Sequence, residues 1–379
     1  MRASLLALVL AGCSFQAKQA GGAAGDDAPV DAAIISPDSA PLDGKLPAVC
    51  LGSLVNVCVD PPTDAAIVPT SLNTDSSPAC ARFTSSPDVD ACVIAGTSIT
   101  MNDKIVVTGH KKLILLSTSA ITLNNVLDVA SHVGGTSGPG ADADPCNADG
   151  NPVLLAGGAG GSFVMEGADG GDSPAGGAGR AAKPLTAPAT LRGGCQGATG
   201  GASNTNRGHG GGSVLLVAMN TITIDSNGSI NASGASGTRS SGGGGGGGSG
   251  GMIVLDAPNA VTLNGKCFAN GGAGAGAGTF GSKNNGTDGT DSDAPDHRAT
   301  GGNGNDLGGS GGDGSLGTDS PSNGNSGKHT GPPIGGPNGS GGGGGGAAGV
   351  IDIITKTPPT NTSDPAKLSP PPTISAPRS

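Results

Sequence analysis

Five histidines are the residues of this chain best suited to acid–base chemistry. A catalytic histidine needs a nucleophile or an orienting group in a recognisable arrangement, such as a serine or cysteine in a known motif. All five lie in segments rich in turn-forming residues, and none stands beside such a motif. The sequence therefore predicts solvated loop histidines and no catalytic residue. They are His110, His132, His209, His297 and His329.

Glycine and aspartate between residues 301 and 316 suggest calcium binding as a second kind of chemistry. The run Gly301-Gly302-Asn303-Gly304-Asn305-Asp306-Leu307, followed by a second run that ends at Asp313, resembles the calcium-binding nonapeptide of β-roll proteins. In this chain the apolar residue is out of phase, because Leu307 comes one place early and Leu316 one place late. That residue normally fills the β-roll core. Asp306 and Asp313 are therefore only weak candidate calcium ligands, and no metal or cofactor is expected.

The eight cysteines predict disulfides rather than a metal centre. No CxxC or CxxH spacing of the kind that binds zinc is present. Pairing neighbours in the sequence suggests Cys50–Cys58, Cys80–Cys92 and Cys146–Cys195, although spacing alone does not fix the connectivity. Cys267 is left without a partner, and Cys13 has a different role.

The first fourteen residues have the form of an export signal. Arg2 precedes an apolar run over residues 5–10, which is much shorter than the roughly 20 residues needed to span a bilayer. Leu10-Ala11-Gly12-Cys13 then resembles the lipobox of bacterial lipoproteins. The resemblance implies removal of residues 1–12, lipid on Cys13 and attachment to a membrane of the cell envelope. Ser14, in place of aspartate, implies the outer membrane.

Composition narrows the function classes further. Glycine and proline, 75 and 28 of 379 residues, reach the low-complexity range, and tryptophan and tyrosine are absent. The formal net charge is −10. An acidic chain that lacks aromatic stacking platforms is a poor binder of nucleic acid, so no nucleic-acid partner is expected. Asp, Asn, Ser, Thr and Gly also disfavour helix interiors.

An interrupted repeat supplies the elements of the fold. Its units read apolar, Thr, apolar, Asn, a turn residue, and then a second short alternating run, and an apolar run precedes each unit. Three short strands per repeat, with Ile99 and Ile121 22 residues apart, resemble a turn of the right-handed parallel β-helix. Stacking then predicts two inward ladders and an asparagine corner. The ladders are Ile99, Ile121, Ile222, Val261 and Ile105, Leu127, Ile230, Cys267; the corner is Asn102, Asn124, Asn227, Asn264.

The expected fold class is all-β: a short parallel β-helix with long glycine-rich insertions and disordered termini. An antiparallel sandwich of hairpins is the alternative. Glycine-rich insertions interrupt the repeat and are expected to be disordered or weakly ordered, although side by side they could form a polyglycine-like array. The expected parts are a signal peptide (1–12), a tether (13–48), a disulfide-stapled cap (49–90), the interrupted β-helix (91–356), its insertions (132–212, 235–251, 272–348) and a disordered tail (357–379).

These features predict a non-enzymatic envelope lipoprotein that presents glycine-rich loops in a structural or adhesive role, with a surface or matrix polymer as partner. It resembles the glycine-rich surface proteins of several bacterial groups. Polysaccharide-acting β-helix enzymes are the alternative, but only Asp128 is acidic among the outward positions of the repeat units. Calcium binding and ice binding by the threonines are further alternatives. Oligomeric state is not predicted.

Overall fold

The chain is an all-β protein built mainly from parallel strands. No helix occurs in the described part, so that part contains no helix able to cross a membrane. Residues 1–45, which include the expected signal peptide, Cys13 and most of the tether, lie outside it. The computed structural model describes residues 46–146, 152, 154–177, 179, 183–185, 187–201, 207–240, 242–281, 285–330, 338–361, 364 and 366–377.

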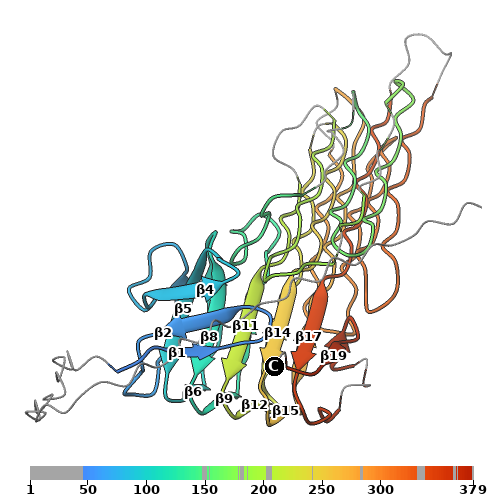
Figure 1. Cartoon of the computed structure of the whole chain (residues 1–379). Helices are drawn as coiled ribbons and strands as arrows, with labels where there is room; N and C mark the ends of the chain where they lie inside the picture. The colour runs from blue at the N-terminus through green and yellow to red at the C-terminus, as the bar shows by residue number, and fades with distance from the viewer. Residues whose placement is uncertain are drawn as a thin grey trace, which may run out of the picture. The chain divides into compact units, whose positions relative to one another are not determined.

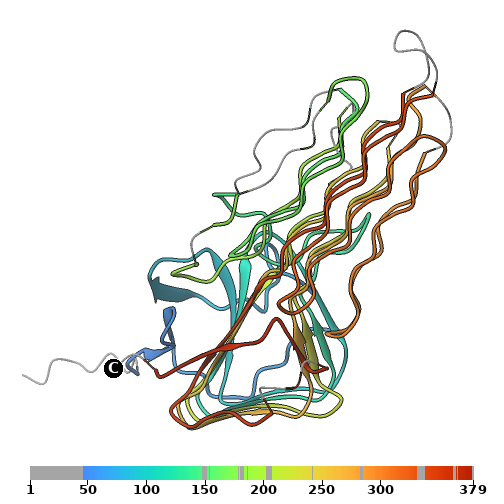
Figure 2. The same cartoon turned by 90° about the vertical axis from the view of Figure 1, so that its right-hand side faces the viewer.

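Three parallel sheets contain the strands of the repeat (Figures 1 and 2). Sheet 1 consists of β5 (Ala91–Gly96), β8 (Lys112–Ser117), β11 (Ser213–Ala218), β14 (Met252–Asp256), β17 (Val350–Ile354) and β19 (Thr373–Ser375). Sheet 2 consists of β6 (Ile99–Met101), β9 (Ala120–Leu123), β12 (Thr221–Ile224) and β15 (Ala260–Leu263). Sheet 3 consists of β3 (Ser71–Asn73), β7 (Ile105–Thr108), β10 (Val126–Asp128), β13 (Ser229–Asn231), β16 (Lys266–Phe268) and β18 (Leu368–Ser369). From β5 to β17 the chain passes through sheets 1, 2 and 3 in turn and then starts again.

The strand register places like residues above one another. Ile121 pairs with Ile99 on one side and with Ile222 on the other, and Val261 follows Ile222. In sheet 3, Leu127 lies between Ile105 and Ile230, and Cys267 follows Ile230. All these side chains are buried in one apolar cluster. The register is the one that the repeat predicts, because a slip of one residue would turn each ladder toward solvent.

The cap covers more than the end of the sheets. Its strands β1 (Val49–Leu51), β2 (Asn56–Val59) and β4 (Phe83–Ser86) form an antiparallel sheet that crosses the outer face of sheet 1 (Figure 1). Val55 and Val57 of the cap and Leu116 and Leu215 of sheet 1 belong to one buried cluster. Sheet 1 is therefore apolar on both faces. At the end of the stack, the segment expected to be the cap also supplies β3, which pairs with β7 as the first strand of sheet 3.

The tail, expected to be disordered over 357–379, instead supplies the last strands. β18 pairs with β16, and β19 pairs with β17. Leu368 is only 3% exposed and stacks on Cys267 in the core. The proline-rich composition was misleading: proline favours extended backbone in the residue before it and is tolerated on edge strands.

The glycine-rich insertions are also ordered where they are described, and the expectation of disorder is wrong there. Each insertion leaves from a strand of sheet 3 and returns to a strand of sheet 1: β10 to β11, β13 to β14, and β16 to β17. Its extended passes lie side by side beyond the ends of the strands (Figures 1 and 2). A lone segment of this composition cannot offset its ordering entropy. Packed together, however, the passes pair their backbone groups with one another.

Candidate functional site

The ordered passes of the insertions form what we call the glycine array. Its described passes are 155–163, 166–173, 193–201, 207–212, 232–240, 242–251, 269–279, 285–292, 299–306, 307–316, 320–328 and 338–349. Each pass is extended but pairs with no neighbour in the manner of a β-ladder. The array is the largest feature outside the three sheets and the cap, and is therefore the first candidate for a functional surface.

Hydrogen bonds within the array recur at every third residue. Gly158 donates its N–H to the carbonyl of Gly244 (2.9 Å), and Gly161, three residues later, donates to Gly247 (2.8 Å). The same spacing joins Gly244 to Gly341 (2.9 Å) and Gly247 to Gly344 (3.0 Å). A chain that presents the same side every three residues has the symmetry of a polyproline II helix, which makes no hydrogen bonds within itself. Here the neighbouring passes supply the missing partners.

The central pass, 242–251, is hydrogen-bonded to six others. Every described residue in it is buried, and it contains one serine and otherwise only glycine. Because it has six neighbours, each of its three sides faces backbone rather than solvent. Larger side chains would have no space there, which explains why the pass is almost entirely glycine. The six neighbours are 155–163, 193–201, 207–212, 232–240, 269–279 and 338–349.

Glycine is required in the array because the backbones approach closely. A Cβ atom added to Gly160 would lie 1.8 Å from the carbonyl oxygen of Gly345, and one added to Gly345 would lie 1.8 Å from that of Asp313. Both distances are far below van der Waals contact, and the obstructing atoms are backbone, which cannot rotate away. The interior of the array is thus mostly packed peptide groups, with a small cluster of buried side chains at Ala159 and Ala198.

Exposed apolar residues mark the end of the array that is remote from the sheets. Leu154, at the start of one pass, and Phe280, at the end of another, are each 57% exposed. Exposed Lys328 and half-buried His329 belong to the same end, since Gly339 of the adjacent pass bonds to Lys328 and the N–H of Phe280 bonds to Asn338 (3.1 Å). We call this region the distal end.

The histidines serve as links between segments. In four of them Nδ1 is bonded to an acidic or amide side chain: His110 to Asp75 (2.9 Å), His209 to Asp142 (2.6 Å), His297 to Asp293 (2.8 Å) and His329 to Asn338 (2.8 Å). The expectation of loop positions holds, but these side chains contact specific partners. Two of the partners, Asp75 and Asp142, are 35 and 67 residues away along the chain from their histidines, so sequence reasoning missed them.

His132 is the most heavily contacted histidine. Its Nε2 lies 3.3 Å from Asp128 and its Nδ1 lies 3.7 Å from Asp291, while Lys104 lies 3.7 Å from Asp128. These contacts, first with Asp128 and then with Asp291, raise the pKa of His132 to about 10. Asp291 also accepts backbone N–H groups from Val133 and Ser236 (2.7 Å each). This junction joins all three insertions at the base of the array.

The weak calcium candidates do not come together as a site. Asp313 accepts the N–H of Gly301 (2.8 Å) and so links two passes, while exposed Asp306 occupies a turn with a φ of 52°. Across the described residues, no group of three or more His, Cys, Asp or Glu side chains could hold a metal ion.

Two carboxylates that sequence reasoning missed lie on the outer face of sheet 1. Burial raises the pKa of Asp256 and of Asp352 above the ordinary value, although Ser53 of the cap hydrogen-bonds to Asp256. A cleft of about 450 Å³ beside Asp256 and one of about 210 Å³ beside Asp352 share Ser53 in their walls. The signal in the sequence is an aspartate at an outward position of an otherwise apolar strand.

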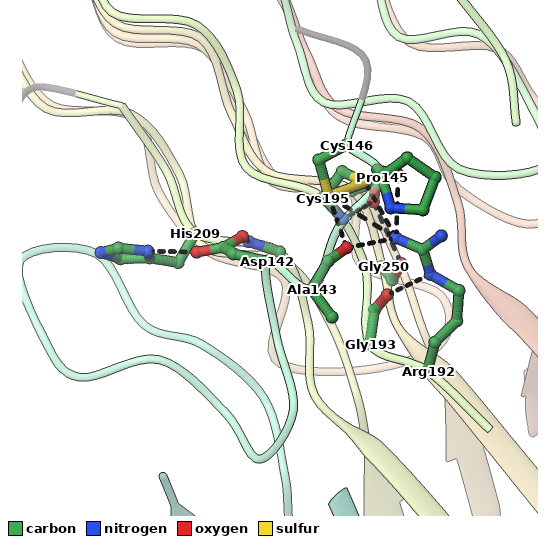
Figure 3. The surroundings of a disulfide bond; sticks show 11 residues. Asp142, Ala143, Pro145, Cys146, Arg192, Gly193, Cys195, His209 and Gly250 are labelled. Carbon is green, nitrogen blue, oxygen red and sulfur yellow. Dashed lines mark hydrogen bonds and ion pairs between the residues drawn. A yellow bond between two sulfur atoms is a disulfide. The ribbon is translucent and has the colours of Figure 1, made fainter. Parts of the chain in front are cut away.

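The structure contains the three disulfides that neighbour pairing suggests: Cys50–Cys58, Cys80–Cys92 and Cys146–Cys195. The third joins two parts of the first insertion (Figure 3). Cys267 is a free, buried thiol in the core, and burial raises its pKa to about 12. It is thus a core residue, not a nucleophile.

Comparison with known proteins finds no matching family model, no matching curated protein and no matching solved structure.

Proposed function

We propose that the chain is a non-enzymatic envelope lipoprotein whose glycine array is an adhesive or structural scaffold. In this proposal the three sheets form a short right-handed parallel β-helix. The cyclic order of the strands supports a solenoid, and the strong preference of parallel crossovers for the right hand supports its handedness. Lipid on Cys13 anchors the protein, with the outer membrane as the favoured location.

The observation that carries the proposal is the hydrogen bonding of the array. Backbone groups of adjacent passes satisfy one another at every third residue, so the passes are held mainly by backbone hydrogen bonds. Such packing holds the described ends of the passes at the distal end. Phe280 and Leu154 are each exposed there, and we propose them as contact residues. A cell-surface or matrix polymer is the proposed partner.

One observation favours the alternative, a polysaccharide-acting enzyme. Val254 pairs with Asp352, so Asp256 lies diagonally across the two neighbouring strands, and strand spacing places its Cα roughly 8 Å from the Cα of Asp352. Inverting glycosidases hold their two carboxyl groups about 6.5–9.5 Å apart, and their general acid has a raised pKa. Against this alternative, Asp256 is only 3% exposed and is bonded to the cap.

One experiment separates the two functions. Beads that carry the full-length protein are placed on surfaces coated with a polysaccharide or with a matrix protein. The number of beads retained and the cleavage of the coating polymer are measured in the same experiment. We expect retention without cleavage, and a loss of about tenfold in retention for the double variant Leu154→Ser, Phe280→Ser. Ile67→Ser, at a cap residue that is 86% exposed, is the matched control and should leave retention unchanged.

Two results would count against the scaffold. Equal retention of the distal-end variant and of Ile67→Ser would show that the distal end is not the binding surface. Release of new reducing ends by the unmodified protein, abolished in Asp256→Asn, would instead identify the chain as an enzyme.

A further inference from the structure

The Cys146–Cys195 disulfide lies against a positive charge. Nη2 of Arg192 is 3.6 Å from Sγ of Cys146 and 3.5 Å from Sγ of Cys195 (Figure 3). The same nitrogen donates to the carbonyl oxygen of Ala143 (2.7 Å), and the guanidinium lies 5.6 Å from the ring centre of Phe163. These contacts fix the guanidinium beside both sulfur atoms.

The charge of Arg192 is directed toward the disulfide rather than toward a bonded carboxylate. Its side-chain hydrogen bonds go to the carbonyl groups of Ala143, Pro145 and Gly193 and to the two sulfurs. Asp144 supplies only a longer-range attraction. Arginine stays protonated in proteins, so the guanidinium of Arg192 would stabilise a thiolate formed at either sulfur.

The two sulfurs differ in access. Cys195 is 2% exposed, whereas Cys146 is partly exposed at the surface of the array. An external thiolate can therefore reach Cys146 and not Cys195. This difference in exposure makes Sγ of Cys146 the sulfur that is attacked and Sγ of Cys195 the leaving group.

We propose that Cys146–Cys195 is a thiol-exchange site for small thiols or for a dithiol reductant. The external thiolate attacks Sγ of Cys146 and forms a mixed disulfide there. The Cys146–Cys195 bond breaks, and its electron pair goes to Sγ of Cys195, which leaves as a thiolate beside Arg192. The step exchanges one disulfide for another and needs no oxidant. A leaving thiolate stabilised by a cation departs faster.

The surrounding framework allows this exchange without unfolding. The N–H of Cys195 donates to Oγ of Ser249 (2.8 Å), and the N–H of Ser249 donates back to the carbonyl of Cys195 (2.9 Å). On the other side, Asp142 bonds through its N–H to Gly194 (2.8 Å) and through its carboxylate to His209. The two sulfurs therefore stay near each other after exchange, and the bond can form again.

Cys80–Cys92 is a matched comparison within the same chain. It also joins a partly exposed cysteine to a buried one, with Cys92 at 0% exposure. Sγ of Cys80 contacts the carbonyl of Thr74 rather than a cation. If access alone governed exchange, the two bridges would react alike.

The test is timed exposure of the full chain to reduced glutathione, alkylation of free thiols, and mass spectrometry of each cysteine peptide. We expect glutathione on Cys146 and alkylation on Cys195, at a rate about tenfold above reaction at Cys80–Cys92. Glutathione found first on Cys195 or on Cys80 would overturn the proposal without recourse to any variant.

Two variants test the role of the charge. Arg192→Gln should slow exchange at Cys146 about tenfold, whereas Arg192→Lys, which keeps a cation, should stay closer to the original rate. The rate at Cys80–Cys92 in the same sample shows whether the fold is intact. Exchange at Cys146 that is as fast in a folded Arg192→Gln protein as in the original would refute the assignment.

Discussion

At the scale of single residues, the chain uses its charged groups as links between segments that are distant in sequence. His132 is the clearest case, since it contacts Asp128 of β10 and Asp291 of the third insertion. Asp291 in turn holds backbone N–H groups of the other two insertions. Protonation of one imidazole thus supports a junction on which the base of the whole array depends.

The junction predicts a pH dependence of stability. The pKa of His132 is raised in the folded state from 6.5 to about 10, so its contribution is fully present below pH 6.5 and is lost as pH rises toward 10. Because the side chain is 46% exposed, solvent screening reduces the effect to about 1–2 kcal/mol. Urea unfolding at pH 6 and pH 10 measures it.

The control for this prediction is a comparison of two variants. His132→Asn should remove the extra loss of stability between the two pH values, whereas His297→Asn, at an exposed pair with Asp293, should not. An unfolding free energy that falls equally in His132→Asn and in the original chain would show that other groups cause the dependence.

At the scale of elements, the passes of the array can be tested by adding a single methyl group. Gly345→Ala would place a Cβ 1.8 Å from the carbonyl of Asp313, so the backbone must shift, and we expect a loss of about 3 kcal/mol. Asn303→Ala, at an exposed position of the same array, is the matched control and should cost little. The measurement is the urea unfolding free energy of each variant; an equal, small effect would mean that the array is loosely packed.

The sequence predicts the sheets better than it predicts the array. The ladder from Ile99 to Val261 follows from alternation with a turn at asparagine, a pattern that depends on local geometry. Strands β18 and β19 are too short to show an alternation of apolar and polar residues, and the segments around them are rich in proline. The array has a signal of its own, a period of three, as in Gly-Gly-Ala-Gly-Gly-Ser over 157–162 and Gly-Thr-Asp-Gly-Thr-Asp over 286–291.

The candidate sites were harder to predict than the strands for a related reason. His132 and Asp291, or Ser53 and Asp256, are brought together only when distant segments pack, and nothing in their local sequence marks the pairing. The disulfide partners are nearer in sequence, and simple neighbour pairing gives the same pairs as the structure.

At the scale of the whole molecule, the described residues belong to one compact unit that begins at Leu46. Cys13 precedes that unit in the sequence and lies outside the described residues. We therefore expect Cys13→Ala to move the protein from the membrane fraction to the soluble fraction without changing its melting temperature. Fractionation of cells and thermal melting of the purified proteins measure the two effects. Retention of Cys13→Ala in the membrane fraction would contradict the lipid anchor.

The close packing inside the array also limits how the amino-acid sequence can change during evolution. Where backbone faces backbone, as at Gly160 and Gly345, every replacement adds atoms that have no space, so selection keeps one residue type. On the outer passes, a position such as Asn303 is exposed and is free to change. Homologues of this protein should therefore keep the spacing of the glycines while the residues between the glycines diverge. Homology would then be detectable from the glycine spacing even where overall sequence identity is low.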